Sequence, residues 1–219
     1  MEDVDMEDWV KNQDALSTAV VLDVLDAIGL RRQAILNLAP RTLPGPTVGR
    51  AKTLQWVDLT QDDPNTYELE LRAVDSIIAH DLVVCATAGS RRAGIWGELL
   101  TTAAMRRGAA GIVTDGAVRD LARMEAMGFP VFARDLSPYD SMNRQKVVGF
   151  DVAVEIDGVA IAPGDVIIAD RDGVAVVPQS VERQVLPAAL DKIRAENGFR
   201  DAVRGGMSLS EAYRRFQVL

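Results

Sequence analysis

The chain has 219 residues, of which 48% are hydrophobic, with a net charge of -8 and a pI near 4.7. This length suits one well-buried mixed domain and is short for two independent cores. The acidic balance, without basic runs interleaved with aromatics, excludes a typical nucleic-acid-binding surface. Residues 1–10 lack the pattern of a signal peptide, and no stretch approaches the about 18 apolar residues of a membrane span. We therefore expect a cytoplasmic protein with no nucleic-acid or membrane partner.

A helix is predicted over residues 17–29. Ser17 is a favourable N-cap, and Gly29 is typical of a helix C-terminus. One helical face is apolar and is formed by Val20, Val21, Val24, Leu25 and Ile28. Asp23 and Asp26 share another face, so this helix should pack on one side and present carboxylates on the other.

The middle of the chain alternates between strand and helix patterns. Strands are predicted over residues 45–58, 81–89, 110–116 and 129–134, and helices over residues 67–80, about 96–107 and 118–127. This order is typical of an α/β domain whose strands are parallel.

The last third has a different pattern. Residues 147–178 are rich in Val and Ile and contain the turn sequences IDG, PGD and RDG, which predicts a run of antiparallel strands. The chain then becomes helical, with a Ser208-to-Glu211 start for a last short helix. We expect one domain with a central sheet, an N-terminal extension over residues 1–12, and a helical tail over residues 181–219 that contacts a neighbouring subunit.

Few side chains are available for nucleophilic or soft-metal chemistry. Cys85 is the only cysteine, which excludes an intrachain disulfide, and its apolar surroundings favour a core position. His80 is the only histidine and precedes an apolar run, which favours a turn at a strand entry. Lys52, in an alternating segment, is the one lysine placed to act as a Schiff-base amine. Abundant carboxylates and arginines instead suit a hard-cation site for oxygen-rich substrates.

Two segments predict a shared pocket. The helix that begins near Gly97 has free N–H groups in its first turn, where an anion can bind. The segment GIVTDGAVRD, residues 111–120, ends with Asp115, Arg119 and Asp120 after an apolar strand. Because parallel strands joined by a helix end on the same side of a sheet, these two segments should be neighbours.

The same residues also have ordinary structural interpretations. Asp115-Gly116 is a common turn pair. Asp120 could be a helix N-terminal carboxylate, and Arg119 could form a surface ion pair with Asp120 or Glu125. Glu98 could be a simple first-turn acid. Taken residue by residue, the pattern leaves both interpretations open.

Residues 96–134, WGELLTTAAMRRGAAGIVTDGAVRDLARMEAMGFPVFAR, closely resemble the RraA-like family, which includes the 4-hydroxy-4-methyl-2-oxoglutarate aldolases. The segments LSTAVVLDVLDA, RAKTLQ and GVAIAPGDVIIADRDGVAVVP resemble the same family, so the likeness covers most of the chain. The DGxVRD sequence followed by a PVFA strand is its most specific part. The resemblance implies a swivelling β/β/α domain, assembled as a homotrimer or homohexamer with active sites between subunits.

The resemblance also implies an activity. Proteins of this kind are class II pyruvate aldolases that use Mg²⁺ or Mn²⁺ to cleave a 4-hydroxy-2-keto acid, such as 4-hydroxy-4-methyl-2-oxoglutarate, to pyruvate, and they often decarboxylate oxaloacetate. Carried onto this sequence, Asp120 corresponds to the residue that holds the metal and Arg119 to the one that binds the keto acid. Glu98 matches the acid that acts on the catalytic water.

The resemblance suggests further parts of the site. The carboxylate of the pyruvyl group would bind at the backbone of the helix start, at Gly97, Glu98, Leu99 and Leu100. Asp23 and Glu196 are the candidates for two acids supplied by an adjacent subunit. Arg92 is a candidate for binding a second polar or anionic group of the substrate.

The chemistry of the reaction agrees with these roles. Cleavage of the carbon–carbon bond leaves a pyruvate enolate, which needs fixed positive charge beside its oxygen. A metal and Arg119 would supply that charge. A base must also remove the C4 hydroxyl proton, and a water polarised by Glu98, helped by Asp23 or Glu196, is the available route. Decarboxylation of oxaloacetate produces the same enolate.

Two alternatives come from other classes. RraA-type regulators of the same family bind and inhibit a ribonuclease without aldolase activity, and they tend to lack the aspartate of the Arg-Asp pair, whereas Asp120 is present here. A Schiff-base aldolase using Lys52 would instead be trapped by borohydride with a keto acid and would be insensitive to chelators.

Overall fold

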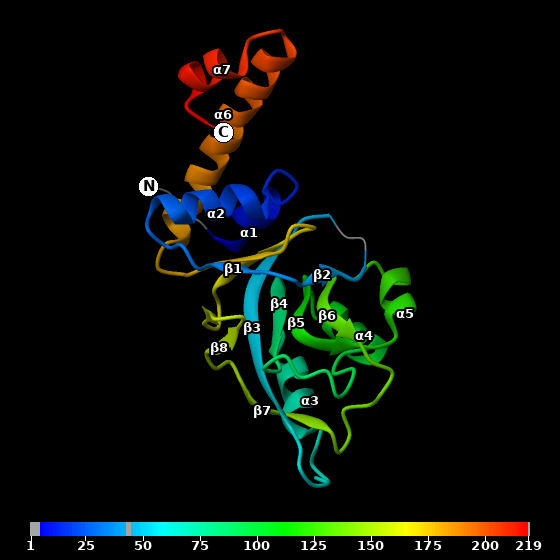
Figure 1. Ribbon diagram of the computed structural model, residues 1–219. Coiled ribbons are helices and arrows are strands. Elements are labelled where there is room, and N and C mark those ends of the chain that lie inside the picture. The colour runs from blue at the N-terminus through cyan, green and yellow to red at the C-terminus, as the bar shows by residue number, and fades with distance from the viewer. Residues whose placement is uncertain (1–4, 43–44, 219) are drawn as a thin grey trace.

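A nine-stranded sheet forms the centre of the computed structural model, which describes residues 5–42 and 45–218 (Figure 1). Its middle strands are parallel: β3 (Thr47–Asp58), β4 (Asp81–Ala86), β5 (Gly111–Val118) and β6 (Val131–Leu136). Three helices connect them in turn: α3 (Glu68–Asp75), α4 (Glu98–Arg106) and α5 (Leu121–Ala126). The predicted α/β alternation is confirmed, and it places the carboxyl ends of these strands at one edge.

Antiparallel strands extend this parallel centre on both sides. Beyond β3 lie β10 (Val166–Ala169), β11 (Val174–Val177) and β1 (Ala34–Ile35), and beyond β6 lies β2 (Ala39–Pro40). The far half of β3 pairs with β7 (Gln145–Phe150), and a separate hairpin joins β8 (Val154–Ile156) to β9 (Val159–Ile161). The antiparallel arrangement predicted for the last third is confirmed.

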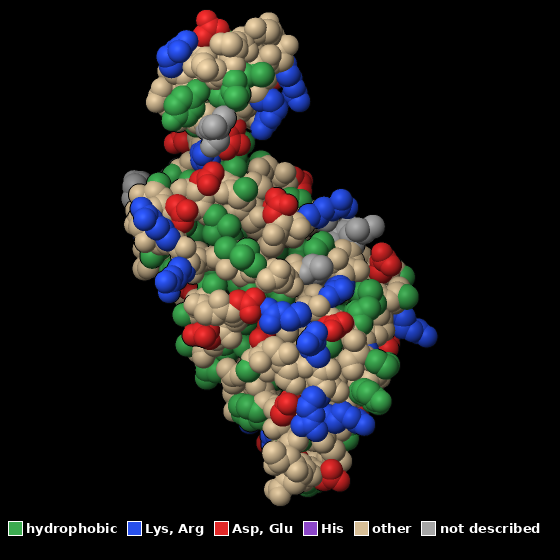
Figure 2. All heavy atoms as spheres, viewed as in Figure 1, with side chains coloured by type: hydrophobic (Ala, Val, Ile, Leu, Met, Phe, Trp, Pro, Cys, Tyr) green, Lys and Arg blue, Asp and Glu red, His purple; other side chains and the backbone are tan. Residues whose placement is uncertain are grey.

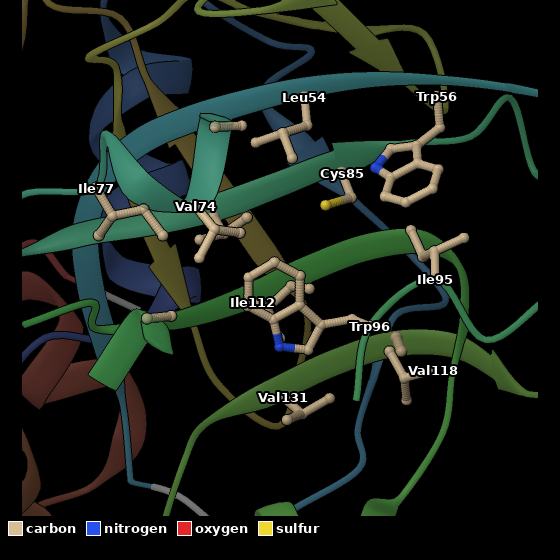
Figure 3. Packing of buried hydrophobic residues seen from close by; sticks show 14 of the residues in the cluster. Leu54, Trp56, Val74, Ile77, Cys85, Ile95, Trp96, Ile112, Val118 and Val131 are labelled. Carbon is tan, nitrogen blue, oxygen red and sulfur yellow. The ribbon is translucent and has the colours of Figure 1, made fainter. Parts of the chain in front are cut away.

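One face of the sheet is covered by the connecting helices. Leu54, Cys85 and Ile112, from three neighbouring strands, pack with Val74 and Trp96 in a buried cluster (Figure 3). Burial raises the pKa of the Cys85 thiol, which opposes its ionisation. The prediction that Cys85 is a core residue is therefore confirmed.

The N-terminal helices pack on the antiparallel end of the sheet. These are α1 (Met6–Lys11) and α2 (Thr18–Ala27), and they share a buried cluster with the start of α6 (Glu182–Arg204). Trp9 is fully buried there, so the expected N-terminal extension is part of the core from α1 onward, while residues 1–4 lie outside the described residues. Ile28 is 41% exposed, which contradicts its predicted place on the buried face, because the helix ends before it.

The C-terminal helices leave the body of the domain. The far part of α6 and all of α7 (Leu209–Phe216) project as an arm, which we call the C-terminal arm (residues 192–218; Figure 1). Phe216 packs against Phe199 with ring centroids 6.4 Å apart, and Ser208 and Glu211 form the predicted capping box of α7. Acidic and basic side chains are interspersed over this arm and the body (Figure 2). Leu219 lies outside the described residues.

Several predicted boundaries were wrong. Asp115 and Gly116 lie inside β5 and do not form a turn, and α5 begins at Leu121, three residues later than predicted. The helix predicted over residues 67–80 ends at Asp75, where the Ser76 hydroxyl donates a hydrogen bond to the Ala73 carbonyl. His80 then has a positive φ in the turn before β4, which confirms its place at a strand entry. None of the described helices is long and apolar enough to cross a membrane.

Candidate active site

The segment before α4 runs along the end of β5. The Ile95 N–H donates to the Ala117 carbonyl at 2.9 Å, and the Arg119 N–H donates to the Trp96 carbonyl at 2.8 Å. Gly94 also forms an isolated bridge with Ala117. The start of α4 and the end of β5 are therefore joined through their backbones, as the β-α-β geometry predicts.

Asp115 holds the loop after β4, which leads into the segment before α4, through hydrogen bonds. Its carboxylate is buried and accepts hydrogen bonds from the Thr87 N–H at 2.6 Å, the Thr87 hydroxyl at 2.9 Å and the Gly89 N–H at 2.7 Å. A β-bulge between Thr114 and Ala117 accompanies this arrangement. Asp115 therefore holds the loop after β4, which explains why the Asp-Gly pair is strand and not turn.

Arg119 and Asp120 follow β5 directly. Asp120 occupies the N-cap position of α5 with φ 56°, yet its carboxylate does not cap that helix. The carboxylate instead accepts the Glu98 N–H at 3.3 Å, at the start of α4, and its Oδ2 lies 3.8 Å from the Arg119 Nε. The Arg-Asp pair is therefore directed toward the N-terminus of α4, where the helix dipole favours negative charge.

Gly97 is required for this close approach. A Cβ at this position would lie 2.6 Å from the Asp120 Oδ2 and 3.1 Å from the Arg119 Cγ. Any other residue would displace the pair, so the glycine that caps α4 also makes room for the two charged side chains.

A cavity of about 300 Å³ opens beside this pair, between α3, α4 and the segments that follow β5 and β6. Its lining combines charged and hydroxyl groups with aliphatic side chains. The lining residues are Tyr67, Glu70, Leu71, Gly94, Ile95, Gly97, Leu99, Leu100, Arg119, Asp120, Asp140 and Ser141. Five predicted site residues, namely Gly97, Leu99, Leu100, Arg119 and Asp120, are thus brought together.

Asp140, from the loop after β6, fixes the other side of Arg119. The Arg119 Nη1 lies 2.8 Å from the Asp140 Oδ2, and the Tyr67 hydroxyl donates to the Asp140 Oδ1. Burial alone would raise the pKa of Asp140, but the bonds from Tyr67, the Met142 amide and Arg119 lower it. Burial and the bond to Asp140 raise the pKa of Tyr67 to about 12. The guanidinium is therefore oriented by a carboxylate that remains ionised.

Glu70 lies deeper in the cavity and was missed in the sequence. Its side chain comes from α3 and is only 4% exposed, and its Oε2 has no hydrogen-bond partner among the described residues. Burial, aided by the negative charge of Asp140 and opposed by Arg119, raises the pKa of Glu70 to about 8. Its helical spacing to the apolar Ala73, Val74 and Ile77 was the available signal, because it places an acid on a buried face.

Four predicted site residues lie elsewhere in this chain. The Glu98 carboxylate accepts a bond from the Thr102 hydroxyl, outside the cavity lining, and only its backbone meets Asp120. Arg92 donates to the Leu59 carbonyl and lies 3.8 Å from Asp58. Asp23 and Glu196 both pair with Lys192, at 3.2 and 3.6 Å, near the base of the C-terminal arm.

Lys52 does not face the cavity. Its ammonium is buried and lies 2.7 Å from the Asp151 carboxylate, above the ring of Phe150. A Schiff-base amine must reach a substrate carbonyl while uncharged. The ion pair therefore disfavours the Schiff-base alternative.

Few carboxylates beside this cavity could bind a divalent cation. The described residues contain no group of three or more His, Cys, Asp or Glu side chains arranged to hold a metal. This excludes, for those residues, a closed site of the zinc type within one chain. Mg²⁺ commonly needs only one or two carboxylates and completes its shell with water and substrate oxygens. Asp120, partly exposed beside the cavity, suits such an open site.

A family model and related sequences assign this chain to the same protein family. A family model described as RraA-like, Aldolase/RraA, matches residues 18–176. A protein of Halalkalibacterium halodurans named "Putative 4-hydroxy-4-methyl-2-oxoglutarate aldolase" is 28% identical over 94% of this chain and 93% of its own. Protein DlpA of Legionella pneumophila is 28% identical over 90% of this chain, which spans only 32% of DlpA.

Solved structures agree with this assignment. An uncharacterised protein of Pseudomonas syringae superimposes with a TM-score of 0.86, 25% identity and 98% of both chains covered. RraAS2 of Streptomyces coelicolor, described as an unusual member of the RNase ES inhibitor RraA protein family, has a TM-score of 0.80 and 30% identity over 91% of this chain and 98% of its own. With the family model covering most of the sheet and the whole Arg-Asp segment, the chain belongs to the RraA-like family.

Proposed function

We propose that this protein is a divalent-metal-dependent pyruvate aldolase. It cleaves a 4-hydroxy-2-keto acid, such as 4-hydroxy-4-methyl-2-oxoglutarate, to give pyruvate. It also decarboxylates oxaloacetate as a side activity. The observation that carries the proposal is the Arg119-Asp120 pair, held against the N-terminus of α4 at the wall of a cavity. Relatives bearing the aldolase name support it.

The first task of the site is to bind the keto acid. The N–H groups of Leu99 and Leu100 lie in the first turn of α4, where they have no partner within the helix and can receive the C1 carboxylate. Arg119, oriented by Asp140, binds the 2-keto oxygen. Asp120 would hold the Mg²⁺ or Mn²⁺ ion, which supplies fixed positive charge beside that oxygen when bound.

Cleavage then breaks the bond between C3 and C4. The C4 hydroxyl loses its proton, its oxygen forms the carbonyl of the leaving half, and the electron pair of the broken bond moves into the pyruvyl half as an enolate. Arg119 stabilises the negative charge on the enolate oxygen. A water accepts the hydroxyl proton with the help of Asp23 or Glu196 of an adjacent subunit, and Glu98 polarises that water once its carboxylate has turned from the Thr102 hydroxyl toward the cavity. Protonation at C3 completes pyruvate.

In this scheme Asp23 and Glu196 act from an adjacent subunit, and the assembly we propose is a homotrimer or homohexamer. In one chain they pair with Lys192 near the C-terminal arm and do not line the cavity with Arg119. The projecting arm suits a contact with a neighbouring subunit (Figure 1). The active sites would then lie between subunits, in a cytoplasmic enzyme.

A second candidate function is regulation of a ribonuclease. It is favoured by the likeness to RraAS2, a protein named for the RNase ES inhibitor family. Asp120 and the cavity beside it favour the enzyme. A protein that only binds a partner surface does not need an acid at a cavity wall with a glycine making room for it.

The test is a panel of oxaloacetate and 4-hydroxy-2-keto acids, assayed for pyruvate with Mg²⁺, with Mn²⁺ and with EDTA. We expect pyruvate release that EDTA abolishes, and a loss of about 10³-fold in kcat/KM for Asp120→Asn. Asp62→Asn, which alters an exposed acid outside the cavity lining, serves as the matched control. Full activity with EDTA or in Asp120→Asn would contradict the proposal. No turnover together with tight ribonuclease binding would favour the regulator.

A further inference from the structure

Glu70 is a buried acid in the wall of the cavity, and its carboxyl group has an unsatisfied oxygen. The side chain is 4% exposed, and its Oε2 has no hydrogen-bond partner among the described residues. Glu70 comes from α3 and lines the same cavity of about 300 Å³ as Arg119 and Asp120. An unsatisfied buried polar atom is a position that a ligand can satisfy. Glu70 is therefore placed to act on a small molecule that Arg119 binds.

The proposed reaction needs a proton donor that has not been assigned. Aldol cleavage and the decarboxylation of oxaloacetate both end with the addition of a proton to C3 of the pyruvate enolate. The roles given to Arg119, Asp120 and Glu98 do not supply this proton. A positioned general acid accelerates such a step by about 10²–10⁴-fold, so an acid within the cavity is expected.

The other polar side chains of the lining are poorly suited to donate this proton. Arg119 does not lose its proton in proteins. Burial opposes ionisation of Asp140, but bonds from Tyr67 and Arg119 hold its pKa below the usual range, so it is ionised. Burial and the bond to Asp140 raise the pKa of Tyr67 to about 12, which makes it a weak acid. Asp120 would bind a cation only as a carboxylate, and the Ser141 hydroxyl is a much weaker acid than a carboxyl group.

Glu70 can hold a proton in the place where these groups cannot supply one. Burial, aided by the negative charge of Asp140 and opposed by Arg119, raises the pKa of Glu70 to about 8. A divalent cation on Asp120 would add positive charge to the cavity and lower this pKa toward neutrality. A general acid is most efficient when its pKa lies near the working pH, because it then both holds and releases its proton. The cation and a protonated Glu70 are therefore compatible.

We propose that Glu70 is the general acid that protonates C3 of the pyruvate enolate. The proposal rests on the proposed aldolase function and adds a catalytic residue to it, for substrates with one carboxylate or two. In this step the O–H bond of Glu70 breaks, the electron pair of the enolate forms the new C3–H bond, and the C2 carbonyl is restored. The Glu70 carboxylate then regains a proton from water.

The first test measures proton transfer at C3 without cleavage of a carbon–carbon bond. By microscopic reversibility, the group that protonates C3 also removes a proton from the methyl group of pyruvate, so pyruvate in D₂O with Mg²⁺ should exchange its methyl protons. NMR follows this exchange, and we expect its rate to fall at least about 10²-fold in Glu70→Gln. Glu70→Asp, which keeps the acid on a shorter side chain, should recover part of the rate.

The matched control for this exchange is Glu68→Gln, which alters an exposed acid of the same helix and should keep the native rate. Exchange at the native rate in Glu70→Gln would overturn this inference and leave the aldolase proposal intact. If the native protein neither exchanges the methyl protons nor forms pyruvate from any keto acid, both proposals fail.

The second test separates a catalytic role from a structural one. Loss of CO₂ from oxaloacetate precedes protonation of C3, so its rate in a single turnover, with enzyme in excess, should stay within about threefold of native in Glu70→Gln. The methyl exchange rate of the same variant should fall as stated. Equal losses in both rates would indicate a disturbed cavity and would overturn the role of Glu70 as the C3 acid.

A third readout does not depend on turnover. Infrared spectra of the native protein and Glu70→Gln are compared at mildly acidic pH, with and without Mg²⁺. The native protein should have a carbonyl band of a protonated carboxylic acid that the variant lacks. A difference spectrum without this band would overturn the assignment of Glu70 as a proton donor.

Discussion

The carboxyl edge of the parallel sheet and the C-terminal arm both carry predicted site residues, but they hold them in different ways. At the edge, backbone bonds join residues 94–97 to the end of β5, and a buried carboxylate ties down the preceding loop. On the arm side, Asp23 and Glu196 share Lys192 through side-chain ion pairs alone, and the Asp23 side chain is 54% exposed. Backbone hydrogen bonds therefore fix the edge, whereas the arm-side acids are held only by ion pairs between side chains.

This difference indicates which part of the chemistry belongs to one chain. Arg119 and Asp120 have their positions determined by the fold, and a cavity stands ready beside them. Asp23 and Glu196 have no such setting within the chain and acquire a catalytic role only if a neighbouring subunit receives them. Each of the following variants disturbs one side of this comparison.

The largest effect on stability is expected from Asp115→Ala, which removes the carboxylate that holds the loop after β4. It leaves the N–H groups of Thr87 and Gly89 without their acceptor, while the Thr87 hydroxyl keeps the Ser90 carbonyl, and we expect a loss of about 3 kcal/mol in the free energy of unfolding. Urea denaturation measures it. Asp115→Asn keeps the acceptor at Oδ1 but turns a donor toward Gly89, so an intermediate loss is expected. Equal stability of the Ala variant and the native protein would contradict the role of Asp115.

Gly97→Ala adds a methyl group at this edge of the sheet without removing any polar group. The added Cβ would meet the Asp120 carboxylate and the Arg119 side chain, so we expect kcat/KM for pyruvate formation to fall about 10²-fold with little loss of stability. Gly45→Ala, where the added Cβ meets nothing within 4 Å, is the control. Unchanged activity in Gly97→Ala would show that the pair tolerates displacement and is not the centre of the site.

The sequence predicts the edge better than the rest of the site, for a physical reason. Apolar runs and glycine caps identify β5 and α4, and the parallel β-α-β geometry then brings Gly97 to Arg119 and Asp120 without further information. Glu70 and Asp140 join the site from α3 and from the loop after β6, so only tertiary packing brings them together. Spacing along the chain does not encode that contact.

Asp115 illustrates a second limit. An Asp-Gly pair has a local preference for turns, yet here burial of the carboxylate and its three hydrogen bonds outweigh that preference and extend the strand. In the same way, the sequence indicates that Asp120 lies near the start of a helix, but the direction of its side chain depends on the approach of Gly97.

Glu70→Gln tests the protonation state of this buried acid through the pH dependence of the protein's stability. The pKa of Glu70 rises from 4.5 to about 8 in the folded protein. Between these values the unfolded chain releases a proton that the folded protein retains, so Glu70 lowers stability as pH rises, by at most about 1.4 kcal/mol per pH unit. The Gln variant lacks this contribution and should gain stability relative to the native protein from pH 4.5 to 8. Urea denaturation over this range measures it, and parallel curves for native and variant proteins would contradict the buried, protonated acid.

The smallest effect on stability is expected on the arm side, from Asp23→Asn. Its partner Lys192 lies 3.2 Å away, but the Asp23 side chain is 54% exposed, so the change should be under about 0.5 kcal/mol. If Asp23 serves the site of a neighbouring subunit, kcat should nevertheless fall about tenfold or more. Asp26→Asn, which alters an exposed acid on the same helix, is the control.

Mixing variants separates a role within the chain from a role between chains. When Asp23→Asn and Asp120→Asn subunits are reassembled together in equal amounts, about a quarter of the shared sites would combine both native aspartates if each site takes one from each of two subunits. Activity should then rise above that of either variant alone. If both residues act within one chain, no mixed assembly contains an intact site, because every subunit lacks one of the two. Recovery on mixing would therefore assign the arm-side acid to the neighbouring subunit's site, and the absence of recovery would remove Asp23 from the proposed mechanism in that role.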